Sequence, residues 1–219
     1  KKGFIKMNII FLGAPGAGKG TQSARISEHF KIPTISTGNV IREALKSGSE
    51  MGLKVKSYID KGDLVPDDVV IGIVKDRISL DDCKNGFILD GFPRTLAQAE
   101  ALDNLGVNID KVIDIEVDDE VIYKRMSGRR ICSECGSTYN VEGAGGVRPK
   151  TNGKCDVCAG ALVQRMDDKL ETVKQRLKVY YEQTHILKSY YDKQNKRFVI
   201  DGCKSVDDIT KDIIKVLEA

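Results

Sequence analysis

The stretch Gly13-Ala14-Pro15-Gly16-Ala17-Gly18-Lys19-Gly20-Thr21 decides the fold of this chain. It follows the apolar run Ile9-Ile10-Phe11-Leu12 and precedes a segment with helical spacing, so the pattern G-x-x-x-x-G-K lies between a buried strand and a helix. Glycines let backbone N–H groups approach phosphate oxygens, because a Cβ atom would block the approach. The helix N-terminus adds free N–H groups and the positive end of its dipole. The stretch therefore predicts a phosphate-binding loop for a nucleotide, with an ordinary glycine-rich turn as the weaker alternative.

Two side chains of this loop are expected to have different roles in nucleotide binding. Lys19 supplies a mobile ammonium for the β- and γ-phosphates, and Thr21 supplies a hydroxyl close to a phosphate-bound metal ion. One feature departs from the general pattern, because Gly20 separates Lys19 from the hydroxyl residue.

Composition limits the class of protein. The 219 residues suit one core domain with insertions, and a hydrophobic content of 41% is enough for a buried core. A net charge of +3 is too small for a nucleic-acid coat. No apolar run approaches the ~20 residues of a membrane helix. The basic start at residues 1–6 runs directly into the first strand, so we expect a loose leader with Met7 as the natural start, and a cytoplasmic protein.

Strand and helix patterns alternate along the chain. Apolar runs closed by turn residues predict strands at 9–12, 33–36, 86–91, 112–117 and 197–201. Helical spacing is found after the loop, at 40–46, 53–60, 94–105 and 118–127, in one long helix after Asp168, and in a closing helix after Val206. This order predicts an α/β fold, with a parallel sheet of five strands wrapped by helices on both faces.

Local signals add three expectations. Asp67 is placed to cap the following helix, and Asp168 with Glu171 resembles a capping box that opens the long helix. That helix carries its apolar positions from Leu170 to Leu187. The region Gly143–Gly146 is expected to be a loop tip only.

Four of the six cysteines have metal-ligand spacing. The pairs Cys132-x-x-Cys135 and Cys155-x-x-Cys158 are separated by residues 136–154, which matches the zinc pattern C-x₂-C-x₁₅₋₂₀-C-x₂-C. Four thiolates complete a tetrahedron, so the zinc is expected to be structural. Redox dithiols or disulfides are the alternative. Cys83 and Cys203 stand alone and are read as buried or incidental thiols.

Several motifs together resemble one family, the adenylate kinases. They are the loop Gly13–Thr21, Thr37-Gly38-x-x-x-Arg42, Leu89-Asp90-Gly91-Phe92-Pro93-Arg94 with Gln98, Gly128-Arg129-Arg130, and Arg165-x-Asp167-Asp168. The similarity extends from Met7 almost to the C-terminus, and the cysteine segment resembles the long lid of the bacterial form. Asn39 departs from the family, which usually carries Asp there, and this puts the local capping in doubt.

The resemblance implies the reaction ATP + AMP ⇌ 2 ADP with Mg²⁺. Because the acceptor phosphate oxygen is already ionised, this chemistry needs no protein nucleophile or general base. It needs two polyanions brought together and their charge neutralised, and two unit charges ~4 Å apart interact by about 4 kcal/mol at an effective dielectric near 20. Arginine suits this task, being permanently charged and able to contact phosphate in a planar fork.

Site residues follow from the resemblance, motif by motif. The residues expected to act on the reacting phosphates are Lys19, Arg42, Arg94, Arg129, Arg165 and Arg176. The ATP site would comprise Gly16, Ala17, Gly18, Lys19, Gly20, Thr21, Arg125, Arg129, Thr138, Tyr139 and Lys204. The AMP site would comprise Thr37, Gly38, Arg42, Asp63, Leu64, Val65, Gly91, Phe92, Pro93, Arg94, Gln98, Arg165 and Arg176. Gln98 would pair with the adenine amino edge, Asp90 would orient water on Mg²⁺, and Asp167 and Asp168 would position the arginines or cap their helix.

The resemblance also implies a division of the chain. Residues 1–35, 66–127 and 166–219 would form the core, 36–65 an AMP-binding insert, and 128–165 a zinc-binding lid. The expected partners are ATP, AMP and ADP, with no nucleic acid and no membrane, and the family expectation is a monomer.

Three alternatives stay open. The first is a kinase for another nucleoside monophosphate, or one that takes GTP as the donor. The second is a regulatory GTP-binding switch, which should carry N-K-x-D, and this sequence has none. The third is a zinc-ribbon nucleic-acid module fused to an ATPase, which the nearly neutral charge disfavours.

Overall fold

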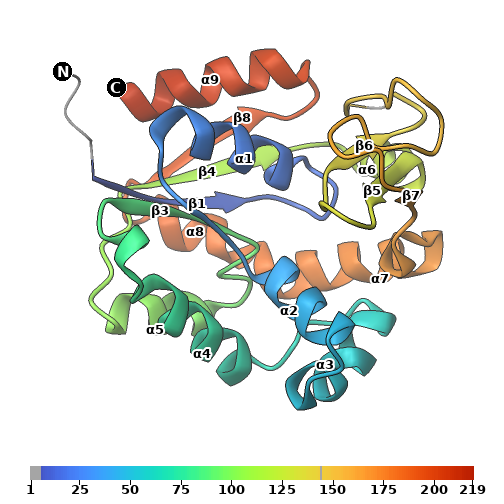
Figure 1. Cartoon of the computed structure of the whole chain (residues 1–219). Coiled ribbons are helices and arrows are strands. Elements are labelled where there is room, and N and C mark those ends of the chain that lie inside the picture. The colour runs from blue at the N-terminus through green and yellow to red at the C-terminus, as the bar shows by residue number, and fades with distance from the viewer. Residues whose placement is uncertain (1–5, 144) are drawn as a thin grey trace.

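The computed structural model describes residues 6–143 and 145–219, so the leader predicted at residues 1–6 lies, apart from Lys6, outside the described residues. A five-stranded parallel sheet in the order β2-β3-β1-β4-β8 forms the centre of the molecule (Figure 1). Its strands are β1 (Met7–Leu12), β2 (Thr34–Ser36), β3 (Gly86–Asp90), β4 (Lys111–Glu116) and β8 (Arg197–Asp201). The predicted α/β sheet of five parallel strands is confirmed.

Helices cover both faces of this sheet. The helices of the described residues are α1 (Lys19–Phe30), α2 (Thr37–Lys46), α3 (Glu50–Lys61), α4 (Asp67–Ile78), α5 (Leu96–Asn104), α6 (Asp119–Gly128), α7 (Leu170–Val179), α8 (Ile186–Asp192) and α9 (Val206–Glu218), with short 3₁₀ turns at Asp81–Cys83 and Met166–Asp168. Helices α1 and α9 lie on one face, and α4, α5 and α8 lie on the other (Figure 1). Within the described ranges, no helix is long and apolar enough to cross a membrane.

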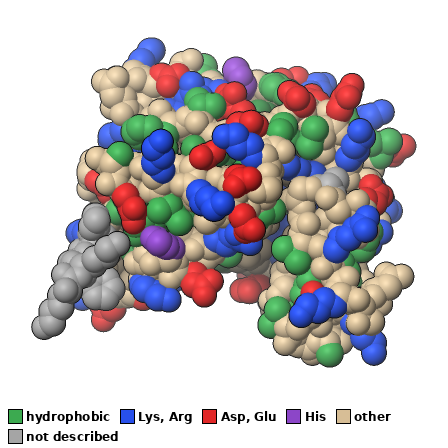
Figure 2. All heavy atoms as spheres, turned by 90° about the horizontal axis from the view of Figure 1, so that it is seen from above, with side chains coloured by type: hydrophobic (Ala, Val, Ile, Leu, Met, Phe, Trp, Pro, Cys, Tyr) green, Lys and Arg blue, Asp and Glu red, His purple; other side chains and the backbone are tan. Residues whose placement is uncertain are grey.

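Strand β1 shows why the sheet is buried on both sides. Ile9 and Phe11 pack with α1 and α9, whereas Ile10 and Leu12 pack in the cluster on the opposite face. Successive side chains of a strand point to opposite faces, so a continuous apolar run satisfies both layers. Over the face formed by α1 and α9, acidic and basic side chains are intermingled, in keeping with the small net charge (Figure 2).

The parallel register brings the carboxyl ends of the strands to one edge. Phe11 is paired with Asp90, and Leu12 is paired with Asp114. The predicted phosphate loop follows β1 at this edge, and ligands of open α/β sheets bind in the crevice outside the carboxyl ends of the strands.

Two insertions flank the carboxyl edge. Helices α2 and α3 pack against each other on one side, and the three-stranded antiparallel sheet β6-β5-β7 lies on the other, near α6 and α7 (Figure 1). Its strands are β5 (Arg129–Cys132), β6 (Thr138–Asn140) and β7 (Leu162–Val163). No strand pattern in the cysteine segment had indicated this small sheet.

Both predicted caps are wrong. Asp67 is the first residue of α4 and caps nothing, because its carboxylate accepts hydrogen bonds from Thr95 Oγ1 at 2.9 Å and from Gln98 Nε2 at 2.6 Å. Asp168 ends a 3₁₀ turn and pairs with Arg129, so α7 begins after Lys169 without a side-chain cap. In both places a tertiary partner outcompetes the local backbone.

The predicted long helix is interrupted. A π-helical turn, Tyr180–Thr184, separates α7 from α8. Leu170, expected on the apolar face, is 58% exposed, whereas Val173, Leu177 and Leu187 are buried as predicted.

Two glycines inside helices provide a test of the packing between α2 and α3. A Cβ atom on Gly52 would lie 2.2 Å from the carbonyl oxygen of Ala44, whereas a Cβ atom on Gly72 in α4 would meet nothing within 4 Å. We expect Gly72→Ala to raise the free energy of unfolding by about 0.5–1 kcal/mol, through helix propensity alone. Gly52→Ala should lower it by about 1–3 kcal/mol, because the two helix backbones must separate. Urea denaturation of both variants measures the difference, and equal effects would contradict the close approach.

Candidate active site

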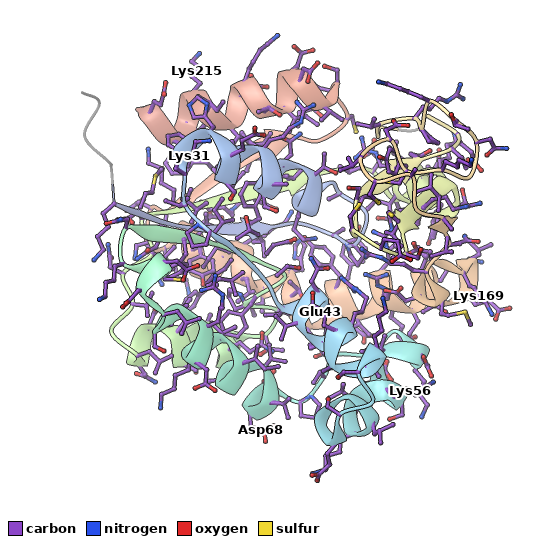
Figure 3. The ribbon with its side chains drawn as sticks, viewed as in Figure 1. Lys31, Glu43, Lys56, Asp68, Lys169 and Lys215 are labelled. Carbon is purple, nitrogen blue, oxygen red and sulfur yellow. The ribbon has the colours of Figure 1, made fainter. Side chains whose placement is uncertain are left out.

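A cavity of about 630 Å³ opens at the carboxyl edge of the large sheet, between the phosphate loop, the α2–α3 pair, α7 and the small β6-β5-β7 sheet of the predicted lid, residues 128–165. Side chains extend from α2, from α7 and from the segment of the small sheet toward the space between them (Figure 3). The predicted nucleotide-site residues that line it are Gly16, Gly18, Lys19, Gly20, Thr21, Thr37, Gly38, Arg42, Asp63, Leu64, Val65, Asp90, Gly91, Pro93, Arg94, Gln98, Arg125, Arg129, Thr138, Tyr139, Arg165 and Arg176. Segments more than 150 residues apart in sequence are thus gathered around one space.

Three predicted nucleotide-site residues do not line the cavity. Ala17 is 1% exposed and belongs to the core on the α1 side, and Phe92 is also 1% exposed and packs in the opposite core. Lys204 lies at the surface, where its Nζ donates to Asp212 Oδ2 of α9 at 2.7 Å. For Ala17 and Phe92, the adjacent residues Gly16, Gly18, Gly91 and Pro93 line the cavity instead.

The phosphate loop curls around its own lysine. Gly13, Gly16 and Gly18 have φ angles of 136°, 84° and 104°, which other residues rarely adopt, and a Cβ atom on Gly13 would lie 2.5 Å from the carbonyl oxygen of Ile115. Lys19 Nζ donates to the carbonyls of Gly13 at 2.7 Å and Ala14 at 2.9 Å. Burial lowers the pKa of Lys19 to about 8, against the raising effect of Asp90. The loop is therefore preformed, and the ammonium lacks a strong counter-charge.

Buried aspartates hold two of the arginines in place. Arg129 Nε donates to Asp168 Oδ2 at 2.8 Å, and Arg176 Nη1 donates to Asp167 Oδ2 at 2.8 Å. Burial acts to raise the pKa of Asp167, but Arg176 and the neighbouring arginines outweigh it and lower that pKa. Of the two roles expected for these carboxylates, they perform the positioning of arginines.

Positive charge is in excess throughout the cavity. Among its lining residues in the described part of the chain, seven are Lys or Arg and three are Asp. Burial, together with the other arginines, lowers the pKa of Arg165 to about 9, and burial also lowers the pKa values of Arg94 and Arg176. Such an arrangement of fixed cations favours a polyanion, because the charges are already oriented before it arrives.

The α2 side of the cavity is organised by short polar contacts. Thr37 Oγ1 and Arg94 Nε both donate to the carbonyl of Gly91, each at 2.9 Å. Arg42 Nη2 donates to Asn39 Oδ1 at 2.8 Å. Asn39, the departure from the family pattern, therefore orients Arg42, while α2 has no side-chain cap.

Gln98 is held by the protein itself. Its Oε1 accepts from the backbone N–H of Arg94 at 2.8 Å, and its Nε2 donates to Asp67. The side chain is 1% exposed, although it lines the cavity. Its amide links the Arg94 loop to α4.

Arg125 lines the cavity as predicted, together with residues that the sequence did not indicate. Arg125 donates to the carbonyls of Ala17 at 3.2 Å and Gly202 at 2.7 Å. Gly145 and Gly146 line the cavity beside it, so the expectation of a mere loop tip is wrong. Tyr180 and Thr184 also line the cavity, and the helical pattern gave no sign that they face it.

The four lid cysteines converge as predicted. Their Sγ atoms all lie within 4.8 Å of one another, with Cys132 and Cys158 at 3.4 Å and Cys135 and Cys155 at 3.5 Å. A Zn–S distance near 2.3 Å places tetrahedral sulfur ligands roughly 3.8 Å apart. The donor set and its spacing therefore fit a four-coordinate metal ion, and all six cysteines of the chain are free.

Tyr139 belongs to the wall between cavity and cysteines. Its hydroxyl lies 3.3 Å from Cys155 Sγ and accepts the backbone N–H of Asp156 at 2.8 Å. It is buried among Cys132, Cys155 and Leu162 in the small lid core. A hydrogen bond of this kind orients a metal-binding thiolate.

Comparison with known proteins gives one consistent result. The family model described as adenylate kinase matches residues 11–196. The chain is 54% identical over 215 residues to an adenylate kinase of Thermosipho africanus, covering 96% of this chain and 99% of that protein. It is 56% identical over 215 residues to one of Caldicellulosiruptor bescii, with the same coverage. It is 53% identical over 216 residues to one of Archaeoglobus fulgidus, covering 97% of this chain and 98% of that protein.

The pKa of Lys19 generates a prediction about binding. In the nucleotide-free protein the ammonium is lost as pH rises through about 8, whereas a bound triphosphate would hold the proton and raise this pKa. We expect the Kd for ATP to rise above pH 8, approaching tenfold per pH unit. Calorimetric titrations at pH 7 and 9.5, in two buffers of different ionisation enthalpy, measure the affinity and the proton uptake. In Lys19→Met this pH dependence should be absent. If the Kd for ATP of the unaltered protein is the same at pH 7 and pH 9.5, the predicted contact between Lys19 and the phosphates is contradicted.

Proposed function

Since this chain belongs to the adenylate kinase family and is a nucleoside monophosphate kinase, we propose that its cavity holds ATP and AMP end to end, with the arginine cluster around the transferring phosphoryl group. The observation that carries this proposal is the convergence of five arginines from separate segments on Lys19. They are Arg42, Arg94, Arg129, Arg165 and Arg176. The reaction is ATP + AMP ⇌ 2 ADP.

The donor phosphates are assigned to the loop after β1. Its backbone N–H groups and the N-terminus of α1 would bind the phosphate oxygens, and Lys19 would leave the carbonyls of Gly13 and Ala14 for the β- and γ-phosphates. Arg125, held by the carbonyls of Ala17 and Gly202, would stack over the adenine.

Mg²⁺ accompanies ATP in adenylate kinases, and it supplies charge neutralisation across the phosphates. The residues present fit this ion. The carboxylate of Asp90 reaches the start of α1, where a Cβ on Gly20 would lie 3.4 Å from Asp90 Oδ2. Asp90 would orient the waters that Mg²⁺ retains, and Thr21 would offer its hydroxyl.

The acceptor is assigned to the α2 side. Arg42 and Arg94 would hold the AMP phosphate, and Leu64 and Val65 would pack on its base. Gln98 would read the adenine edge, and to do so it must exchange one of its bonds to Arg94 and Asp67.

The chain's own residues perform catalysis by position and charge. The acceptor oxygen is already ionised, so no side chain has to remove a proton from it. Arginines held at the transferring group stabilise charge that spreads in the transition state, and one such arginine contributes about 10³–10⁵ in rate. Asp167 and Asp168 reduce the freedom of Arg176 and Arg129 before substrate arrives, which lowers the reorganisation needed during reaction.

We also propose the division of labour among the chain's parts. Residues 1–35, 66–127 and 166–219 form the core, 36–65 the AMP-binding insert, and 128–165 the lid that closes over ATP and excludes water. Lid closure is a known property of this family. The proposed state is a cytoplasmic monomer acting on ATP, AMP and ADP, without nucleic acid or membrane.

Zinc is the metal proposed for the lid. Cys132, Cys135, Cys155 and Cys158 would hold it, and four thiolates leave no open position for chemistry. The lid has a small apolar core around Tyr139 and Leu162, so metal ligation would stabilise it where side-chain burial cannot.

Metal analysis tests this assignment directly. Fresh, reduced protein should contain about one zinc ion per chain, and Cys155→Ser should lose most of it together with the protease resistance of the lid. Cys203→Ser is the matched control, because that cysteine is exposed and lies outside the cluster. If fresh, reduced protein contains no zinc, the assignment of the four cysteines to a zinc site is contradicted.

Removal of single arginines tests the catalytic proposal. We expect Arg94→Ala and Arg129→Ala to lower kcat by about 10³-fold or more while the circular dichroism spectrum is retained. Arg25→Ala should leave kcat unchanged, because Arg25 pairs with Asp207 between α1 and α9. Turnover within a few-fold of the unaltered protein in Arg94→Ala would remove that residue from the scheme.

A kinase for another monophosphate, or one that uses GTP, is the second candidate. The bonds that engage Gln98 favour neither base by themselves. Rates of diphosphate formation with AMP, CMP, UMP and GMP, and with ATP or GTP as donor, separate these functions.

A further inference from the structure

The helix that borders the cavity contains one irregular turn. Between α7 and α8, the backbone N–H of His185 donates to the carbonyl of Tyr180 at 2.9 Å, which closes a turn five residues long. Such π turns are rare and frequently occur at functional sites. The extra residue rotates every following side chain by about 100° around the helix axis, since an α-helix has 3.6 residues per turn.

This rotation lets the two halves of the helix serve different layers. In α7, Val173 and Leu177 pack with Ile122 and Met126 of α6. In α8, Leu187 packs in the cluster on the α4–α5 face of the sheet. The π turn lies where the helix passes from one cluster to the other.

Thr184 ends this turn and faces the active site. It is 6% exposed and lines the cavity, and its Oγ1 donates to the carbonyl oxygen of Arg94 at 2.7 Å. A threonine inside a helix commonly bonds the carbonyl four residues before it, which here would be that of Tyr180. Here the hydroxyl donates instead across to the Arg94 loop.

This contact connects the Arg94 backbone directly to the long helix, while Gln98 connects it to α4. In the part of the chain that the structure describes, the other hydrogen bonds of Arg94 stay local in sequence, from Arg94 N–H to Gln98 and from Nε to the carbonyl of Gly91. Thr184 joins the loop to the helix that also carries Arg176. Two arginines assigned to phosphate are thus connected to the same long helix, Arg176 as part of it and Arg94 through Thr184.

We propose that Thr184 is a positioning residue for Arg94, and that the π turn exists in this helix to bring its hydroxyl to the Arg94 carbonyl. The inference rests on the proposed role of Arg94 at the acceptor phosphate. Thr184 acts through the loop and not on the nucleotide. Its loss should therefore affect AMP and turnover and leave the ATP site unchanged.

Thr184→Val tests this, because valine keeps the branched shape and removes the hydroxyl. We expect kcat/KM for AMP to fall about 3–10-fold, through a lower kcat and a higher KM for AMP together, which is what one neutral hydrogen bond is worth. The KM for ATP should stay within twofold. Thr184→Ser, which restores the hydroxyl, should recover both parameters. Thr210→Val is the matched control, because it removes a hydroxyl bonded within α9 and to Gln22, away from the cavity.

The outcomes distinguish the role of Thr184 from the role of Arg94 on which it rests. If Arg94→Ala retains turnover, the role of Arg94 fails, and the inference fails with it. If Arg94→Ala is inactive but Thr184→Val matches the unaltered protein, only the role of Thr184 is overturned. Equal rises in both KM values, with a lowered Tm and no rescue by serine, would show a merely structural threonine. Should Thr184→Val not fold, Thr184→Ala is measured in its place against the same expectations.

Discussion

Like charges held close together inside a cavity are the constraint on which this structure depends. Guanidinium groups repel one another and lose hydration on burial, and both effects lower the pKa values of Arg94, Arg165 and Arg176. The fold must therefore hold them against their own repulsion. It does so with two buried carboxylates, Asp167 and Asp168, and with a sheet edge that provides backbone acceptors. Because the buried guanidinium groups repel one another, the cavity favours a ligand that carries several negative charges.

The parts of the chain meet this constraint in different ways. The sheet and its two helical layers provide a rigid edge, because apolar strands are buried on both faces. The lid has little apolar surface to bury, and its four sulfurs converge in place of a core. The α2–α3 pair depends on backbone contact at Gly52, where no side chain fits.

The local sequence pattern and the tertiary contacts disagree at four positions, and each lies in the site or contacts a residue that lines it. Asp67 and Asp168 have the sequence context of helix caps, yet they bind Gln98 and Arg129. The apolar spacing from Val173 to Leu187 is typical of one straight helix, yet a π turn divides it. The glycines near position 145 have the composition of a surface loop without a function, yet Gly145 lies against Arg125 and both Gly145 and Gly146 line the cavity. A residue that a distant partner requires cannot be recognised from its neighbours in sequence.

The sequence alone determined the phosphate loop, the five parallel strands, the zinc-type cysteine spacing and the family, because each is written in short-range patterns of residue type. Periodicity and motif spacing depend on neighbours along the chain, so they are legible without a structure. Only the tertiary structure decided that Thr184 reaches Arg94, that Gln98 is held between Arg94 and Asp67, and that Lys204 points away from the cavity. Those contacts join segments that meet only after the layers have packed, and the orientation of a side chain within a packed layer depends on all its neighbours at once.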